Sequence, residues 1–385
     1  MAENAAPALR LTRLALTDFR NYATLDWRPA GRLAVITGPN GSGKTNLLEA
    51  ISLLVPGRGL RSARMAELPR QGCTAWAVAS RFTTPAGETE IGTGTAPDGG
   101  ADRRVFRLDG ATPRSQAEIG VLVAAVWLTP QMDRLFQEGA SGRRRFLDRL
   151  VYALEPGHAR EVTAFEAAMS GRNRLLAEGR ADPAWLAGLE DAMARHAVAA
   201  TVARAGLVAR VNAALAGGLA GDFPAAHMAL ACPIGERLAA GPALAAEDWL
   251  REALATGRRR DAAAGSAGVG LHRADMRLSD AATGIAAALA STGQQKALLI
   301  ATVLGHAALL ADSRGFAPLL LLDEPAVHLD PARRAALFAA LARLPVQAFL
   351  TGTDGDIFAP LHGHAEGLRT GAGGLAADPD FPAVG

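Results

Sequence analysis

The residues best suited to chemistry in this sequence form the glycine-rich loop GPNGSGKT at 38–45. The spacing Gly-x4-Gly-Lys-Thr is that of a phosphate-binding loop, whose glycines let the backbone turn its N–H groups toward phosphate oxygens. Lys44 is expected to reach the β- and γ-phosphates, and the Thr45 hydroxyl is expected to ligate Mg²⁺. The nucleotide-binding residues predicted here are Gly38, Pro39, Asn40, Gly41, Ser42, Gly43, Lys44 and Thr45.

A second chemical element lies in LLLLDEPAVHLD at 319–330. Four leucines predict a strand buried on both faces of a parallel sheet, and ligands bind beyond the carboxyl ends of such strands. Asp323 is expected to hold the metal, directly or through water, and Glu324 to activate the attacking water as general base. We therefore predict Glu324 and Lys44 as catalytic residues, Thr45 and Asp323 as metal ligands, and ATP and Mg²⁺ as cofactors.

A third pattern, STGQQKALLIATVL at 291–304, joins small polar residues to an apolar run. By itself it favours a capped core helix, with Lys296 as a solvated or interface charge. It also suits a helix start that offers a hydroxyl and unhindered N–H groups to a phosphate. Asp330, before Pro331 and a helical pattern, predicts an N-cap and is compatible with an interface role.

The elements that must position these residues alternate between strand and helix. A strand is expected over 32–37 and a helix over 45–55, on either side of the glycine loop, and strands are expected over 319–322 and 346–350. These predict an α/β fold with a parallel or mixed sheet. Residues 9–19 predict a first strand, and 76–108 predict hairpins.

The middle of the chain is Ala-rich and mostly helical in pattern from Ser141 to about Leu254. Asp182 and Pro183 predict the start of a helix that ends near Ala216 and spans about 50 Å. The stretch GRRRDAAAGSAGVG at 257–270 predicts a flexible basic loop. The predicted domains are a discontinuous α/β lobe (1–127 and 271–368, with hairpins near 75–110), an inserted helical lobe (128–270) and a disordered tail (369–385).

Composition narrows the class of protein. The net charge is +2 over 385 residues, so local patches must carry any contact with nucleic acid. Two separated cysteines favour a reducing compartment, and the longest apolar run, 297–311, is shorter than the roughly 20 residues of a membrane span. We expect a cytoplasmic protein with no membrane partner.

Two arginine runs have the character of DNA phosphate contacts, although a charge run is often only a solvated surface. They are Arg143, Arg144 and Arg145, and Arg258, Arg259 and Arg260. Aromatic residues make up 5% of the chain and form no cluster. This composition favours contacts with the backbone of duplex DNA over stacking on single-stranded bases.

In combination, the glycine loop, the serine–glycine helix start and the HLD of 328–330 resemble the ABC-type ATPase head. In that family the serine–glycine signature, here Ser291, Thr292, Gly293 and Gln294, closes over ATP held by a partner. The resemblance implies an ATP-dependent head-to-tail homodimer with two shared sites. Asp330 would then lie in the D-loop at the interface.

Four stretches extend this resemblance to the RecF family of DNA repair proteins, over about residues 9–355. They are LALTDFRNY (14–22), GPNGSGKTNLLEAI (38–51), LTPQMDRLFQEGASGRRRFLDRL (128–150) and GLHRADMRL (270–278). The resemblance implies a clamp on double-stranded and gapped DNA that helps RecO and RecR load the recombinase, with slow hydrolysis for release. It also places Gln131 at a γ-phosphate-sensing position, and Arg20, Asn21 and 58–64 near the adenine and ribose.

One departure bears on turnover. Transporter-type heads have a switch histidine after the strand that follows the acidic pair, whereas this chain offers Thr351, Thr353 and Asp354. That difference favours a slow, switch-like ATPase. Two alternatives remain at this point: the ATPase subunit of an ABC transporter, against which the long insert argues, and a P-loop kinase of a small molecule, for which S-T-G-Q would be accidental.

Overall fold

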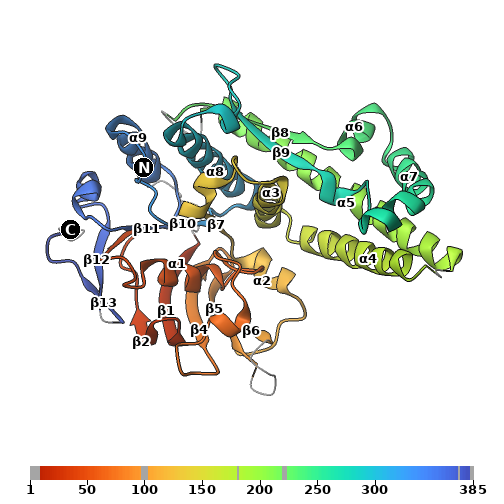
Figure 1. Ribbon diagram of the computed structural model, residues 1–385. Helices are drawn as coiled ribbons and strands as arrows, with labels where there is room; N and C mark the ends of the chain where they lie inside the picture. Colours follow the sequence, from red (N-terminus) through yellow and green to blue (C-terminus); the bar gives the residue numbers. More distant parts are fainter. Residues whose placement is uncertain (1–8, 97–102, 180–181, 219–222, 372, 382–385) are drawn as a thin grey trace. The chain divides into compact units, whose positions relative to one another are not determined.

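The computed structural model describes residues 9–96, 103–179, 182–218, 223–371 and 373–381. The chain divides into two compact units (Figure 1). The first comprises Met1–Arg134, Ala214–Ala225 and Ser291–Gly385, and the second comprises Leu135–Ala213 and Ala226–Ala290. Two segments of the second unit therefore separate the motifs of the first unit from one another in sequence.

The first unit contains a six-stranded sheet in the order β13-β12-β3-β11-β10-β7. All neighbouring pairs are parallel except β12 with β13. The strands are β3 (Leu33–Thr37), β7 (Ala125–Leu128), β10 (Leu319–Leu322), β11 (Ala348–Gly352), β12 (Glu366–Gly371) and β13 (Gly374–Ala377). Every residue of β3, β10 and β11 is buried, as expected for strands covered on both faces.

A second sheet of the same unit is antiparallel, in the order β2-β1-β4-β5-β6. Its strands are β1 (Arg10–Phe19), β2 (Tyr22–Trp27), β4 (Ala77–Thr84), β5 (Gly87–Thr95) and β6 (Arg104–Leu108). In β4 buried and exposed residues alternate, so this strand has one face in the core and one outside. The sequence prediction missed β2, because its interior residues lack that alternation.

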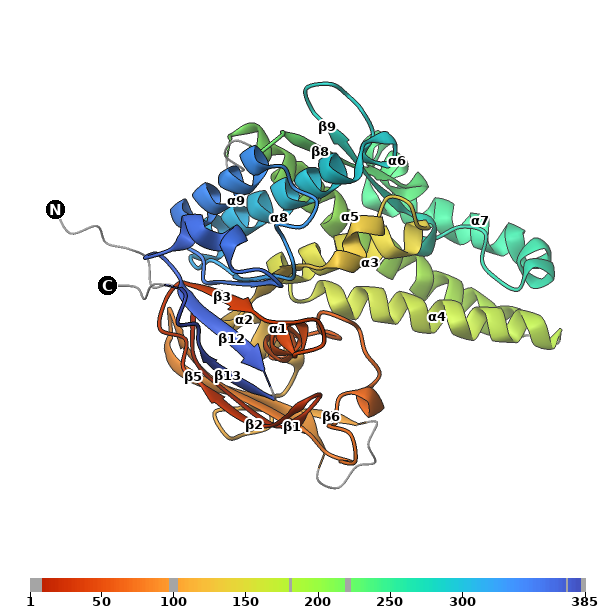
Figure 2. The same cartoon turned by 60° about the vertical axis from the view of Figure 1, so that its left-hand side comes forward.

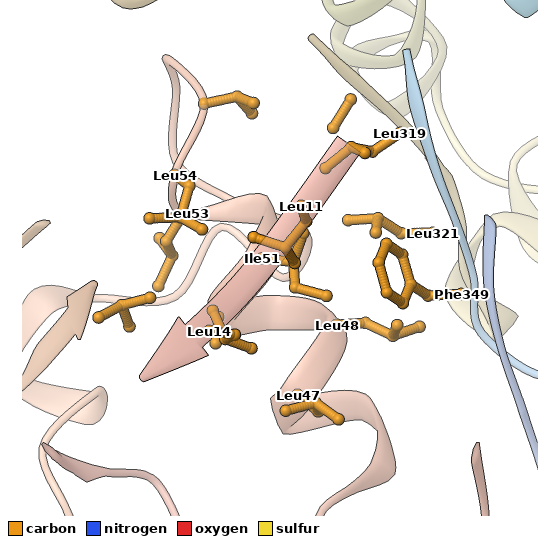
Figure 3. Packing of buried hydrophobic residues seen from close by; sticks show 14 of the residues in the cluster. Leu11, Leu14, Leu47, Leu48, Ile51, Leu53, Leu54, Leu319, Leu321 and Phe349 are labelled. Carbon is orange, nitrogen blue, oxygen red and sulfur yellow. The ribbon is translucent and has the colours of Figure 1, made fainter. Parts of the chain in front are cut away.

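The helix after the glycine loop, α1 (Lys44–Ser52), packs against both sheets. Figure 3 shows how its apolar side chains meet those of the strands in one core. Leu47, Leu48 and Ile51 share this core with Leu14 of β1 and Phe349 of β11. Because α1 is held on two sides, the loop that precedes it has a defined position at the edge of the parallel sheet.

Three further helices complete the first unit: α2 (Gln116–Leu122), α8 (Thr292–Arg314) and α9 (Pro331–Arg343). Figures 1 and 2 both show α8 and α9 lying side by side. From Gln295 to Leu310 every residue of α8 is buried, which confirms the predicted core helix.

The second unit is mainly helical. Its helices are α3 (Ala140–Leu154), α4 (His158–Glu178), α5 (Pro183–Ala216, which ends in the first unit), α6 (Pro233–Ala240) and α7 (Ala243–Ala264), and its two strands are β8 (Ala226–Ala231) and β9 (Asp275–Asp280). The predicted start of α5 is confirmed, since Asp182 Oδ1 accepts a hydrogen bond of 2.8 Å from the N–H of Ala184. The core of this unit includes Phe165, Met193 and Leu250.

Two sequence predictions for the second unit are wrong. The basic stretch 257–270, predicted as a flexible loop, continues α7 to Ala264. Its Ala and Arg residues favour a helix, and the helix buries its own Gly257 and Asp261. Residues 271–290, assigned by sequence to the α/β lobe, belong to the second unit. The reason is β9, which pairs along its whole length with β8, a strand that the helical pattern concealed.

The prediction of a disordered tail from residue 369 is also wrong for the described residues. Figure 2 shows β12 next to β3, and β13 turns back on β12. Thr37 Oγ1 donates to Asp378 Oδ2 over 3.0 Å, which ties this end of the chain to the glycine-loop strand. Gly- and Ala-rich composition hid this pairing, because the strands are held by backbone hydrogen bonds. Residue 372 and residues 382–385 lie outside the described part.

Within the described residues, two helices are long and apolar enough to cross a membrane by length and composition alone, α5 and α8. The most apolar window of α8 is 78% buried inside the protein, and that of α5 is 44% buried. This is weak evidence for a membrane, because the core helix of a soluble protein passes the same test.

A buried ion cluster joins three helices of the second unit. The guanidinium of Arg172 on α4 is completely buried, with Nε 2.9 Å from Glu190 Oε1 and Nη1 2.9 Å from Asp261 Oδ2. Arg258 Nη2 lies 2.5 Å from the other oxygen of Glu190. Charges buried at this depth must be paired, so the cluster fixes α4, α5 and α7 in one arrangement.

We predict that Arg172→Leu lowers the free energy of unfolding by about 3–5 kcal/mol, because it leaves buried carboxylates without their cation. The matched control is Arg195→Leu, which removes an exposed i,i+4 pair with Asp191 and should cost less than about 0.5 kcal/mol. Urea unfolding followed by far-UV circular dichroism measures both. Equal losses in the two variants would contradict the assigned role of the cluster.

Candidate nucleotide site

The glycine loop leaves β3 and enters α1 through three residues with positive φ: Gly38 (146°), Gly41 (80°) and Gly43 (110°). A Cβ atom on Gly43 would lie 2.4 Å from Asn21 Nδ2, and one on Gly38 would lie 2.5 Å from Thr370 Oγ1. Glycine is therefore required at both positions for conformation and for space.

Polar side chains from both sheets hold the loop. Asn21 Nδ2 donates to the carbonyl of Ser42 over 3.0 Å, and the Tyr22 hydroxyl donates to the carbonyl of Gly43 over 3.2 Å. On the other side, the hydroxyls of Ser42 and Thr370 lie 2.6 Å apart. Asn21 and Tyr22 therefore engage carbonyls of the loop and not its N–H groups. The helix after the loop also starts without a side-chain cap, so its first N–H groups are available to an anion.

Lys44 lies folded against this loop. Its Nζ atom donates to the carbonyls of Gly38 (2.7 Å) and Pro39 (2.9 Å), and the residue is 5% exposed. Burial lowers the pKa of Lys44, while the nearby carboxylates of Glu324 and Asp323 oppose that shift. A partly desolvated ammonium at the mouth of a loop of N–H donors fits the charge of a nucleoside triphosphate.

The metal-ligand candidates lie against each other. Thr45 Oγ1 is 3.0 Å from both carboxylate oxygens of Asp323, to which it donates, and Asp323 Oδ1 also accepts from Thr351 Oγ1 over 2.7 Å. Among the described residues no group of three or more His, Cys, Asp and Glu could hold a metal alone. One hydroxyl and one carboxylate nevertheless suit Mg²⁺, which keeps waters and phosphate oxygens as its other ligands.

Glu324 follows Asp323 in a left-handed backbone conformation, with φ 49°. Its N–H donates to Thr351 Oγ1 over 3.0 Å, and its carbonyl accepts from Lys296 Nζ over 2.9 Å. The expectation that Lys296 is a solvated or interface charge is therefore wrong. Its side chain is 1% exposed, because α8 carries it into the core beside the turn that follows β10.

The signature residues form the start of α8. Ser291 is the N-cap: its hydroxyl accepts from the N–H of Gln294 (3.3 Å), and Gln294 Oε1 accepts from the N–H of Ser291 (2.9 Å). Ser291, Thr292 and Gln294 are exposed, whereas the helix after them is buried. A Cβ atom on Gly293 would lie 2.9 Å from the carbonyl of His328, so glycine lets α8 approach the D-loop.

The other predicted residues around the loop have varied placements. The N-cap role of Asp330 is confirmed, since its Oδ1 accepts from the N–H of Arg333 over 2.8 Å. Gln131 is exposed in the 3₁₀ turn Pro130–Arg134 that follows β7. Arg20 is paired through two nitrogens, each 2.8 Å from an oxygen of the buried Glu49 on α1. Sequence reasoning missed Glu49, although a carboxylate on the apolar face of a helix signals a buried partner.

The predicted DNA-contacting arginines divide into two groups. Arg143 makes a two-point contact with Asp275 (2.7 and 3.0 Å), Arg144 donates to the carbonyl of Ala274 (3.0 Å), and Arg258 pairs with Glu190 as described. The remaining three, Arg145, Arg259 and Arg260, are exposed. Contact with DNA stays a prediction for all six, and the exposed three are the more accessible, although Arg260 Nε also lies 3.6 Å from the buried Asp261 Oδ1.

We predict that Gly43→Ala both destabilises the protein and weakens its binding of ATP, because the methyl group meets Asn21 and Tyr22. The matched control is Gly57→Ala: Gly57 has φ 111° and nothing within 4 Å, so this variant carries the backbone cost of about 1–2 kcal/mol alone. Thermal unfolding without nucleotide and titration with a fluorescent ATP analogue separate the two effects. Identical behaviour of the variants in both assays would contradict the packing argument.

Comparisons with known proteins agree with this geometry. The family model described as RecF/RecN/SMC N terminal domain matches residues 10–360. Proteins named DNA replication and repair protein RecF are similar over nearly the whole chain. The one from Mesorhizobium japonicum is 46% identical, covering 96% of this chain and 98% of its own, and the one from Agrobacterium fabrum is 47% identical, covering 95% and 98%.

Solved structures agree in fold. The recombination mediator protein RecF with ATP, from the RecFOR pathway, is similar with a TM-score of 0.84 at 22% identity over 98% of this chain and 100% of its own. An Smc head domain with an extended coiled coil from Pyrococcus furiosus has a TM-score of 0.53 at 15% identity over 96% of each chain. The fold predicted from the sequence, an ABC-type ATPase head with an inserted, mainly helical lobe, is confirmed.

Proposed function

Because this chain belongs to the RecF family, we propose that it is an ATPase of DNA replication and recombinational repair, whose ATP-bound dimer clamps DNA. The dimer would hold duplex DNA at gaps or single-strand/double-strand junctions. There it would help RecO and RecR load the recombinase, and slow hydrolysis would release it. The reaction takes place in the cytoplasm.

The observation that carries this proposal is the exposed start of a buried helix. Ser291, Thr292 and Gln294 are accessible, although α8 is buried from Gln295 to Leu310. The cap that Ser291 provides satisfies the helix within one chain, and its hydroxyl remains at the surface. Such a start is suited to a phosphate that a second copy of the chain presents.

The residues of the first unit divide the work of hydrolysis. The loop N–H groups and Lys44 would hold the triphosphate, and Thr45 and Asp323 would hold Mg²⁺. The metal ion would neutralise charge on the β- and γ-phosphates. Glu324 would accept the proton of the attacking water. Glu324 directly follows Asp323 in the sequence, and its backbone N–H and carbonyl are both hydrogen-bonded.

Slow turnover is supported by the group that stands beside this pair. Thr351 occupies the strand end where transporter-type heads approach a switch histidine. Its hydroxyl is engaged with Asp323 and with the N–H of Glu324. A hydroxyl in this position fixes the acidic pair but carries no proton that titrates near neutral pH. The two alternatives, a transporter subunit and a small-molecule kinase, are not favoured, because relatives matched over nearly the whole chain are RecF proteins.

We predict that ATP converts the wild-type chain from monomer to dimer in the presence of gapped DNA, as measured by multi-angle light scattering. Ser291→Arg should abolish the dimer by filling the signature, and Glu324→Gln should trap it by removing the general base. The matched control is Ser115→Arg, at the exposed start of α2, which should dimerise like the wild type. A wild-type chain that stays monomeric with ATP and DNA would refute the clamp.

We predict that replacing Arg145, Arg259 or Arg260 by Gln weakens binding to duplex DNA and reduces its salt dependence. Each lost phosphate contact should lower the slope of log K against log[salt] by about 0.9. Arg195→Gln serves as the control, because Arg195 lies on the same unit and is already paired with Asp191. Fluorescence anisotropy at several salt concentrations gives the slopes. Unchanged slopes in all three variants would remove these arginines from the DNA interface.

A further inference from the structure

One buried cation has no task in the reaction outlined above. Lys296 is one of only two lysines in the sequence, and the other is Lys44 of the glycine loop. Its Nζ atom lies 2.9 Å from the carbonyl oxygen of Glu324 and 3.4 Å from Asp133 Oδ2. An ammonium is costly to bury unless it is paired and hydrogen-bonded, so both contacts are needed to keep it there.

Lys296 belongs to one of two contacts that fasten α8 to the segment 324–328. Gly293 stands three residues earlier, on the same face of the helix. There a Cβ atom would come within 2.9 Å of the carbonyl of His328. The first turns of α8 thus meet both ends of the turn that follows β10. A movement of the helix start would therefore reach Glu324 and His328 together.

The conformation of Glu324 explains why its carbonyl needs a partner. A non-glycine residue adopts φ near 49° only when its surroundings hold it there. Thr351 Oγ1 accepts from the N–H, and the carbonyl accepts from Lys296 Nζ over 2.9 Å and more weakly from the N–H of Val327 over 3.4 Å, so both polar groups of the backbone are engaged. Since the backbone sets the direction of the Cα–Cβ bond, these bonds restrict the directions that the carboxylate can take.

Asp133 extends the contact to a third segment. It lies two residues after Gln131, in the 3₁₀ turn Pro130–Arg134, and its side chain is 13% exposed. Its second oxygen, Oδ1, is buried and has no hydrogen-bond partner among the described residues, so the ammonium is its main compensation. Burial lowers the pKa of Lys296, and the carboxylates of Asp133, Glu324 and Asp323 oppose that shift.

We propose that Lys296 is a positioning residue for ATP hydrolysis: it aims the carboxylate of Glu324 through the Glu324 carbonyl and couples that aim to the signature at the start of α8. The coupling links the signature, which would engage a partner's nucleotide, to the general base of its own chain. It rests on the proposed ATPase function. The ammonium of lysine is a compact point charge that donates to the Glu324 carbonyl and the Asp133 carboxylate from one atom, which the planar fork of arginine does not reproduce.

The decisive measurement is steady-state hydrolysis of Mg·ATP by the full chain with gapped duplex DNA. Lys296→Met keeps most of the volume and removes the charge. We expect kcat to fall about 10- to 100-fold, the loss typical of a displaced catalytic group, and the Kd for ATP to change less than about twofold. Thr302→Val is the matched control: it removes a buried hydroxyl of α8 that bonds only within the helix, to Leu298, and should leave kcat unchanged.

A double variant separates positioning from stability. Lys296→Met alone strands the carboxylate of Asp133, so a loss of activity could follow from poor folding. Adding Asp133→Leu replaces the whole ion pair by apolar groups, a change that is often neutral for stability. We expect the double variant to recover the Tm of the wild type and to keep the low kcat. Recovery of kcat together with Tm would show that Lys296 is only structural.

Chemical rescue supplies the conservative variant. In a chain with Cys73→Ser and Cys232→Ala, Lys296→Cys can be alkylated with bromoethylamine to restore an ammonium at nearly the length of lysine. Alkylation should return kcat toward that of the cysteine-free parent. No return of kcat in a folded, fully alkylated protein would overturn the proposal. A wild-type chain that binds ATP without hydrolysing it would instead overturn the ATPase function itself.

Discussion

The proposed chemistry of this protein depends on the contact between two distant parts of the chain, in which the Thr45 hydroxyl donates to the Asp323 carboxylate. The two residues are 278 positions apart, and the second unit lies between them in sequence. Parallel pairing brings them together, because β3 and β10 flank β11 and all three end at the same edge of the sheet. The packing of α1 on β10 and β11 then fixes the position of Thr45 relative to the ends of these strands.

Around this contact, the site consists of charged side chains that are buried and only partly solvated. Lys44, Asp323 and Lys296 are all buried, and each has a backbone or hydroxyl partner. Buried ion pairs add little to stability, since desolvation offsets their attraction, but they specify one arrangement. The arrangement specified here puts Lys44 in the glycine loop and Lys296 against the backbone of Glu324, the proposed general base.

The helix α8 has a buried body and an exposed start, and each has a separate role. Its long apolar body must be buried, and that burial fixes its axis in the first unit. Its first turn is exposed and meets the D-loop through Gly293. A rigid helix with one free end is suited to report an event at that end to the turn at Glu324. The proposed dimerisation and the proposed hydrolysis would then both depend on the position of α8.

Local patterns in the sequence determined the elements whose signals lie within a few residues of one another. The glycine loop, the buried leucine strand, the caps at Asp182 and Asp330, and the core helix from Ser291 all follow from spacing and side-chain type. Tertiary structure alone decided what depends on pairing between remote segments. It buried Lys296, since a lysine's surroundings come from other elements. It also ordered the Gly- and Ala-rich strands β12 and β13, because the backbone hydrogen bonds of β12 to β3 and of β13 to β12 leave no mark on composition.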